Sequence, residues 1–147
     1  MLYKEFVIDE WQIVHAKSLG ASGILLIAAV LHQEEMSQLM DCSRKYGLTP
    51  LVEIHNEEEA DIALKLGANC IGINNRDLKS FETSIDVTFN IFKNIPNHVT
   101  VVSESGIKTP HDVEKLLGIG VDAILVGETL LKDKDPGLAI LDLLEKL

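Results

Sequence analysis

Two charged side chains, Lys4 and Glu53, interrupt apolar runs of the sequence, where buried strands would otherwise be uniformly hydrophobic. Glu104, between two serines, lies at the end of another apolar run. An unpaired buried charge is costly, and burial shifts its pKa toward the neutral form. Lys4 and Glu53 are therefore candidates for an acid–base pair that moves protons in catalysis. A buried salt bridge between the same two side chains, with no catalytic role, explains the pattern equally well.

The most distinctive stretch is residues 71–78, IGINNRDL, in which polar residues cut off an apolar run. The pattern predicts a buried strand that ends at Asn74. In parallel α/β proteins, ligands bind at the carboxyl ends of strands, so Asn74 is a candidate binding residue. For Arg76 and Asp77 the pattern favours a local ion pair or loop brace, with a substrate contact from Arg76 as the alternative.

Two glycine turns, Ser105-Gly106 and Gly127-Glu128, follow the last two apolar runs. Glycine lets backbone N–H groups approach an anion closely, and the start of a helix favours negative charge. The residues after Gly127, Glu-Thr-Leu-Leu, predict such a short helix. In barrel enzymes the last two loops often bind phosphate, so the turns predict a phosphate site. Two ordinary turn glycines are the alternative.

The histidines and cysteines do not indicate a metal site. His55 follows the run that contains Glu53 and has a minor claim to function, whereas the other four histidines have helix or loop contexts typical of solvated side chains. Neither residue type shows metal-ligand spacing, and no nucleophile has a base in the pattern of a catalytic triad. We therefore predict no metal.

The composition is that of an acidic globular protein. A net charge of −10 argues against a nucleic-acid partner, which requires a cationic surface. A small anionic substrate remains compatible, because local donors can outweigh the global charge inside a cleft. No apolar run is long enough to span a bilayer, no signal-peptide pattern is present, and Cys42 and Cys70 predict reduced core thiols. We expect a cytoplasmic protein with no membrane partner.

Six apolar runs predict strands, and the segments between them predict helices. Asp9 with Gln12 predicts a capping box, Asn56 predicts an N-cap, and Thr109-Pro110 predicts an N-cap followed by a first-turn proline. The expected strands are residues 2–8, 23–27, 50–54, 70–74, 99–103 and 123–126. The expected helices are residues 10–19, 33–46, 57–66, 84 or 86 to 93, 110–117 and 136–147.

Three junctions from helix into strand resemble one another, in residues 19–27, 66–74 and 119–127. They recur at intervals of roughly fifty residues, about two βα units. Apolar strands that alternate with helices indicate a parallel sheet covered by helices. We expect a single α/β domain over residues 1–147.

Two α/β architectures compete for this pattern. An open doubly wound sheet is expected to carry a glycine-rich turn after its first strand, and none is present. A (β/α)8 TIM barrel accounts for the polar residues at so many strand ends. We therefore predict an incomplete (β/α)8 barrel of about six βα units, strands 3–8, whose closure needs two more strands before Met1.

The chain resembles the indole-3-glycerol-phosphate synthase family, the ring-closing decarboxylases of tryptophan biosynthesis. The similar stretches occur in the family's order and with its spacing: residues 4–13, 24–28, 51–56, 71–78, 102–107 and 125–128. The resemblance implies a lyase that acts on 1-(2-carboxyphenylamino)-1-deoxyribulose 5-phosphate without a metal or organic cofactor.

The resemblance also implies roles for individual residues. Lys4 matches the family's general acid in ring closure, and Glu53 matches the glutamate that takes part in dehydration. The substrate-positioning residues match Asn74 and Glu104, and Arg76 stays a candidate for substrate contact from the pattern alone. The apolar walls around the anthranilate ring match Phe6 and Leu25, and the phosphate loops match Ser105, Gly106, Gly127 and Glu128.

The resemblance has one departure, at the N-terminal end. The family has two further βα units, with a glutamate and a lysine that serve binding and catalysis, and nothing here matches them. We therefore expect a truncated synthase with weak or no turnover. One alternative is a non-catalytic fragment that self-associates through open barrel edges and at most binds phosphate. Another is a different phosphate-binding barrel enzyme, such as a phosphoribosyl isomerase or thiazole synthase, which would lack the combination of Lys4, Glu53 and Asn74.

Overall fold

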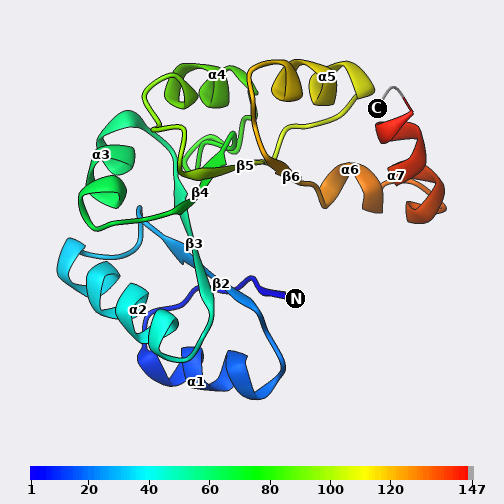
Figure 1. The fold of residues 1–147 in the computed structure, drawn as a ribbon. Coiled ribbons are helices and arrows are strands. Elements are labelled where there is room, and N and C mark those ends of the chain that lie inside the picture. The colour runs from blue at the N-terminus through cyan, green and yellow to red at the C-terminus, as the bar shows by residue number, and fades with distance from the viewer. Residues whose placement is uncertain (146–147) are drawn as a thin grey trace. The chain divides into compact units, whose positions relative to one another are not determined.

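Strands and helices alternate along residues 1–145, the part of the chain that the computed structural model describes (Figure 1). The strands are β1 (Leu2–Tyr3), β2 (Gly23–Ile27), β3 (Thr49–Ile54), β4 (Cys70–Asn74), β5 (Thr100–Glu104) and β6 (Ala123–Leu125). The helices are α1 (Glu10–Ser18), α2 (Gln33–Lys45), α3 (Glu57–Lys65), α4 (Asp86–Phe92), α5 (Pro110–Gly118), α6 (Glu128–Leu131) and α7 (Pro136–Leu144). The chain divides into two compact units, Met1–Gly72 (unit 1) and Ile73–Leu147 (unit 2), which are described separately.

The strand order separates the two architectures that the sequence left open. It is β1-β2-β3-β4-β5-β6, the order of the sequence itself. The pairs β1–β2, β2–β3 and β5–β6 are parallel. A doubly wound sheet reverses its order at a switch point, whereas a (β/α)8 barrel keeps sequence order throughout. The predicted class, an α/β fold of the barrel family with six βα units, is confirmed.

The predicted helix starts are confirmed by their side-chain caps. The Asp9 carboxylate accepts from Trp11 N–H, and Gln12 completes a capping box at the start of α1. Asn56 caps α3 through Glu59 N–H, and Thr109 caps α5 through Asp112 N–H. Each cap satisfies a first-turn N–H that has no acceptor within its own helix. The last predicted helix begins at Pro136 as expected, and its predicted end at 147 lies outside the described residues.

The three similar junctions form the same turn. Gly20, Gly67 and Gly120 have φ values of +82°, +77° and +97°, a backbone region open mainly to glycine. In each turn the next residue donates its N–H to a carbonyl five residues earlier, from Ala21 to Ala16, Ala68 to Ala63 and Val121 to Leu116. This is the hydrogen bond that closes a helix with a left-handed glycine cap.

The core of unit 1 lies between its strands and helices. Helix α2 packs against β2 and β3, and α1 packs against α2. Met36 and Met40 on α2 are buried. Residues of β2 that point to opposite faces, such as Ile24 and Leu25, are also both buried. Burial on both faces explains why this strand is apolar throughout.

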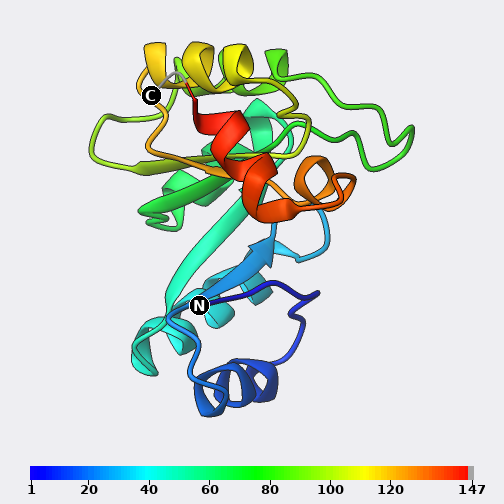
Figure 2. The same ribbon diagram turned by 90° about the vertical axis from the view of Figure 1, so that its right-hand side faces the viewer.

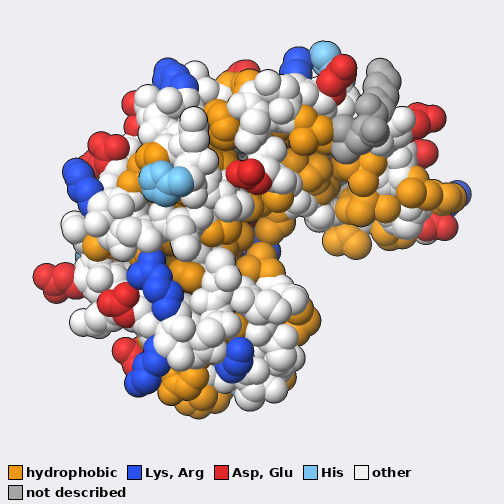
Figure 3. Space-filling model, viewed as in Figure 1, with side chains coloured by type: hydrophobic (Ala, Val, Ile, Leu, Met, Phe, Trp, Pro, Cys, Tyr) orange, Lys and Arg blue, Asp and Glu red, His pale blue; other side chains and the backbone are white. Residues whose placement is uncertain are grey.

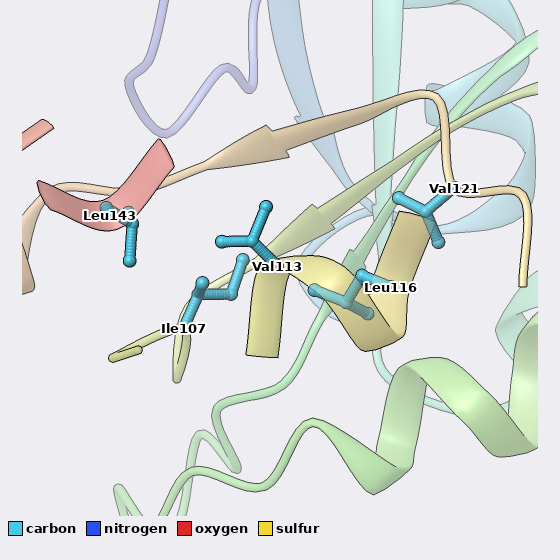
Figure 4. Packing of buried hydrophobic residues seen from close by; sticks show 5 residues of the cluster. All are labelled: Ile107, Val113, Leu116, Val121 and Leu143. Carbon is cyan, nitrogen blue, oxygen red and sulfur yellow. The ribbon is translucent and has the colours of Figure 1, made fainter. Parts of the chain in front are cut away.

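The core of unit 2 lies beside α5. Figure 4 shows Val113 and Leu116 of α5 packed with Leu143 of α7 and with Ile107 and Val121, which flank α5. Figures 1 and 2 show α4 and α5 on one side of β5 and β6. The helical spacing of Val113 and Leu116 puts both on the face of α5 that is covered.

The first predicted strand is wrong beyond Tyr3. The ladder of β1 with β2 ends at the pair Tyr3↔Ile24, so Lys4 lies after the strand and not within it. The side chain of Gln12 provides the reason. Its amide donates to Phe6 O (2.9 Å) and accepts from Ile8 N–H (2.8 Å), so backbone groups of this segment bond to a helix side chain.

The short helix predicted after Gly127 is confirmed as α6. Within residues 1–145, no helix combines the length and the apolarity that crossing a membrane requires.

Candidate functional site

Glu53 is a buried carboxylate near the carboxyl end of β3. Glu53 is only 3% exposed, and its backbone carbonyl accepts a hydrogen bond from Ala28 N–H at 2.9 Å. The strand register pairs Glu53 with Ile27 of β2. Leu25, a predicted wall of the substrate pocket, lies on the same strand β2 and is 1% exposed. A carboxylate in this setting can exchange protons with a ligand while apolar neighbours limit access of water.

His55 lies between two carboxylates. Its ring Nε2 is 3.3 Å from Glu53 Oε1, and its ring Nδ1 is 3.3 Å from Glu59 Oε2. The backbone N–H of His55 donates to the same Glu59 oxygen at 2.8 Å. Asn56, the N-cap of α3, donates to the other Glu59 oxygen at 2.7 Å. Glu59 is thus fixed on α3 and in turn fixes the ring of His55.

The charges of this group follow from its geometry. Burial lowers the pKa of His55, but the contacts with Glu53 and Glu59 outweigh it and raise the pKa to about 9. Burial raises the pKa of Glu59, but hydrogen bonds from His55 and Asn56 outweigh it and hold the pKa below its usual range. Near neutral pH, His55 is therefore a cation and Glu59 an anion.

Lys4 and Phe6 lie in the segment between β1 and α1. Lys4 is exposed directly after β1, and Phe6 is 68% exposed. The alternative of a buried Lys4–Glu53 salt bridge is wrong, because Lys4 is not buried. The structure pairs Glu53 with His55 instead.

The loop after β4 is organised by its own side chains. Asn74 Oδ1 accepts from Arg76 N–H at 3.0 Å, and Asp77 Oδ1 accepts from Lys79 N–H at 2.7 Å and Ser80 N–H at 2.8 Å. The guanidinium of Arg76 binds Glu128 at the start of α6. Arg76 therefore pairs with Glu128 of α6 and not, as the sequence had led us to expect, with Asp77. Asp77 forms the expected loop brace.

Asn75 has a buried, extensively hydrogen-bonded side chain, and the sequence analysis did not single it out. It is 1% exposed. Its amide nitrogen donates to Ser103 Oγ, Glu104 O and Ser105 O, each at 3.0 Å. Its amide oxygen accepts from Thr88 N–H and Thr88 Oγ1. Two signals in the sequence could have pointed to Asn75. It is a second asparagine directly after the strand, and its partners Thr88 and Ser103 are hydroxyl residues in apolar surroundings.

The turn at Ser105-Gly106 adopts a conformation that needs support. Ser105 and Gly106 have φ values of +64° and +73°. A Cβ atom on Gly106 would lie 3.1 Å from Thr83 Cβ, so the backbone approaches Thr83 closely. A left-handed conformation at a residue other than glycine stores strain and is typical of functional turns. The hydrogen bond from Asn75 to Ser105 O is one of the contacts that hold it.

The two predicted phosphate turns lie next to each other. Glu104, 1% exposed at the end of β5, pairs with Leu125 at the end of β6, and Ser105 N–H reaches Leu125 O at 3.4 Å. Thr129 of α6 donates its hydroxyl to Ile107 O at 2.7 Å, which joins α6 to the first turn. Gly127 directly precedes α6.

The side chain of Glu128 is occupied by two cations. It binds Lys132 Nζ at 2.6 Å as well as Arg76, and these contacts hold its pKa below the usual range. A carboxylate repels an anion, so main-chain N–H groups are the donors available to a phosphate at this turn. Among residues 1–145, no cluster of three or more histidine, cysteine, aspartate or glutamate side chains is arranged to hold a metal.

The chain is similar to known proteins of one family. The family model for indole-3-glycerol phosphate synthase matches residues 1–143. A relative from Caldanaerobacter subterraneus is 52% identical over 132 residues, which cover 90% of this chain and 51% of the relative. A relative from Clostridium acetobutylicum is 44% identical over 146 residues, which cover 99% of this chain and 55% of the relative. Both carry the name of the matched family, and the chain spans about half their length.

Solved structures with a similar fold have low sequence identity. The 3-hexulose-6-phosphate synthase of Salmonella typhimurium gives a TM-score of 0.79 at 14% identity, covering 99% of this chain and 72% of that one. A thiamine phosphate pyrophosphorylase from Pyrococcus furiosus gives a TM-score of 0.68 at 21% identity, covering 91% and 62%. At such identities the likeness concerns the fold alone.

Proposed function

Because the chain belongs to the indole-3-glycerol phosphate synthase family, we propose that it carries the active-site residues of a carbon–carbon lyase. The reaction closes the indole ring of 1-(2-carboxyphenylamino)-1-deoxyribulose 5-phosphate and releases carbon dioxide and water. It belongs to tryptophan biosynthesis, in the cytoplasm. The observation that carries the proposal is the family match over residues 1–143, which contain every residue of the proposed site.

The proposed proton transfers use Lys4 and Glu53. Ring closure places negative charge on the substrate carbonyl oxygen, and we assign the general acid that neutralises it to the exposed ammonium of Lys4 after β1. The later loss of water requires a proton on the departing hydroxyl group, and we assign that step to the buried Glu53. These groups need neither a metal nor an organic cofactor.

The remaining residues are assigned to substrate binding. Ser105, Gly106 and Gly127 present the phosphate turns, with the main chain of Glu128 at the start of α6. Asn74, Arg76 and Glu104 position the body of the substrate in this proposal, and Phe6 and Leu25 line the anthranilate ring. The adjacency of the two turns, which follows from the Glu104↔Leu125 register, supports a single anion site.

The test measures the fluorescence of indole-3-glycerol phosphate when the carboxyphenylamino-deoxyribulose phosphate is added. The family's further glutamate and lysine have no counterpart in residues 1–147, so we expect the chain alone to turn over slowly. A chimera makes the test sharper: residues 1–147 replace the matching half of the Caldanaerobacter relative, which is 52% identical. We expect turnover near that of the relative, lost in K4A and E53Q. A folded but inactive chimera would contradict the proposal.

A second candidate function is self-association without catalysis, through the sheet ends β1 and β6 and an apolar surface on α7. Leu138 and Leu141 of α7 are 58% and 64% exposed, and Leu131 of α6 is 77% exposed. Figure 3 shows hydrophobic side chains gathered over α6 and α7. Exposed apolar patches and open strand edges both favour association. Light scattering at rising concentration tests it, and a monomer throughout would exclude it.

A further inference from the structure

His55 is held with a glutamate carboxyl oxygen at each ring nitrogen. Glu53 Oε1 and Glu59 Oε2 each lie 3.3 Å from it, from β3 and α3 respectively. The ring side chain is 12% exposed, so water competes little for either nitrogen. Strand β2, which pairs with β3, contributes no charged side chain. Among residues 1–145, the ion pairs of the His55 ring are those with Glu53 and Glu59.

The arrangement fixes the protonation of the ring on geometric grounds. A neutral imidazole carries one N–H and one lone pair. When both glutamates are ionised, the lone pair of either tautomer would face a carboxylate oxygen at 3.3 Å, which is repulsive. An imidazolium has an N–H on both sides and removes that repulsion. The Nε2 contact with Glu53 is mainly Coulombic, because Nε2 has no well-aligned hydrogen bond.

We propose that His55 is a positioning residue for Glu53: Glu59 clamps one ring nitrogen, and the other presents a fixed positive charge to the Glu53 carboxylate. This inference rests on the proposed function, in which Glu53 gives a proton during dehydration. When Glu53 loses that proton, it gains a negative charge beside the imidazolium. The pair is therefore stabilised more after proton transfer than before it, which is the condition for lowering a barrier.

The test is an NMR titration of the chain with ¹⁵N-labelled histidine and ¹³C-carboxyl-labelled glutamate. We expect both ring nitrogens of His55 to show imidazolium shifts at pH 7.5. In H55Q, the Glu53 carboxyl signal should titrate at a higher pH, because the opposite charge is gone. In E59Q, which keeps the ring, His55 should lose its proton at a lower pH.

A matched control is His111, which has the same 3.3 Å contact with Glu114 but is 64% exposed. H111Q should leave the Glu53 titration unchanged. A neutral His55 at pH 7.5, or an unmoved Glu53 titration in H55Q, would overturn the proposal.

The kinetic arm uses the active chimera. H55Q should change kcat by roughly tenfold with a smaller change in KM, and the pH profile of kcat should shift to higher pH, as expected for an acid that is weaker by about one pKa unit. An unchanged kcat would overturn the positioning role. If the chimera has no activity at all, the proposed function fails, whereas the NMR titration still decides the charge relation between His55 and Glu53.

Discussion

Thr88 is joined to Asn75 twice, since its backbone N–H and its hydroxyl both donate to Asn75 Oδ1, at 3.1 and 2.8 Å. Thr88 lies in the first turn of α4, and no side chain at the N-cap position satisfies that end of the helix. Asn75 therefore caps α4 from the end of β4, while its amide nitrogen holds the carbonyls of Glu104 and Ser105. One side chain connects a helix start with the turn that is proposed to bind phosphate.

N75A should destabilise the chain by about 1–3 kcal/mol, because it leaves buried groups of Thr88 and Ser103 without this partner. Urea unfolding measures the change. N97A, at an exposed asparagine, should stay within about 0.5 kcal/mol. Equal losses for both variants would argue against the capping role of Asn75.

G106A should also destabilise the chain, by about 1–2 kcal/mol, because its φ of +73° is strained for alanine and the Cβ would crowd Thr83. G118A is the matched control. Gly118 ends α5 with open space around it, so alanine there should stabilise by up to about 1 kcal/mol. Thermal unfolding of the two variants should shift in opposite directions, and a shared direction would contradict this reading of the turn.

E128Q should strengthen the binding of inorganic phosphate at the turn before α6. The substitution removes a negative charge from the proposed site and releases the guanidinium of Arg76. Calorimetric titration at low salt measures the affinity. E114Q removes a charge at an exposed position on α5 and should leave the affinity unchanged. Weaker phosphate binding in E128Q would mean that the Arg76–Glu128 pair is needed to shape the site.

The His55–Glu59 pair predicts a window of stability in pH. The pKa of folded His55 is raised to about 9, so its contribution is complete below the unfolded value of 6.5 and is lost as the pH rises through 9. The pKa of Glu59 is lowered, so its contribution is present above the unfolded value of 4.5 and is lost as the pH falls through the folded pKa. E59Q should weaken the pH dependence of the free energy of unfolding on both the acid and the alkaline side. Urea unfolding from pH 4 to 10 measures this dependence. An unchanged pH dependence would contradict the pairing.

L141E should weaken self-association if α7 is part of the contact, because it places a charge in the exposed apolar surface of that helix. Analytical ultracentrifugation measures the dissociation constant. L117E, at an exposed leucine of α5, is the control and should leave it unchanged. Equal association of all three proteins would exclude the α7 surface.

The sequence predicted the parts of this fold that depend on local chemistry. The cap at Asn56 and the glycine turns at Gly20, Gly67 and Gly120 are set by neighbouring residues, so their patterns are readable. Apolar strands such as β4 were equally readable, because both faces are covered. The sequence analysis wrongly placed Lys4 inside a strand. The Gln12 side chain binds backbone groups of the segment that follows β1, and these bonds compete with strand pairing.

The candidate site was less readable, because its decisive contacts join residues far apart in the chain. Asn75 meets Ser103 only once β4 and β5 are folded, and Arg76 meets Glu128 across 52 positions. His55 was undervalued for a different reason. Its partner Glu59 looks like an ordinary first-turn glutamate until the start of α3 turns it back onto the ring.

The three left-handed glycine turns precede β2, β4 and β6, whereas Glu53, Ser105 and Gly127 lie at or beyond the other ends of their strands. The residues that end the helices are thus separate from those that are proposed to face a substrate. Adaptation to heat or cold can act on the first set while the second stays fixed. Substitutions at the helix ends can therefore change the thermal stability of this chain without changing the residues of the proposed site.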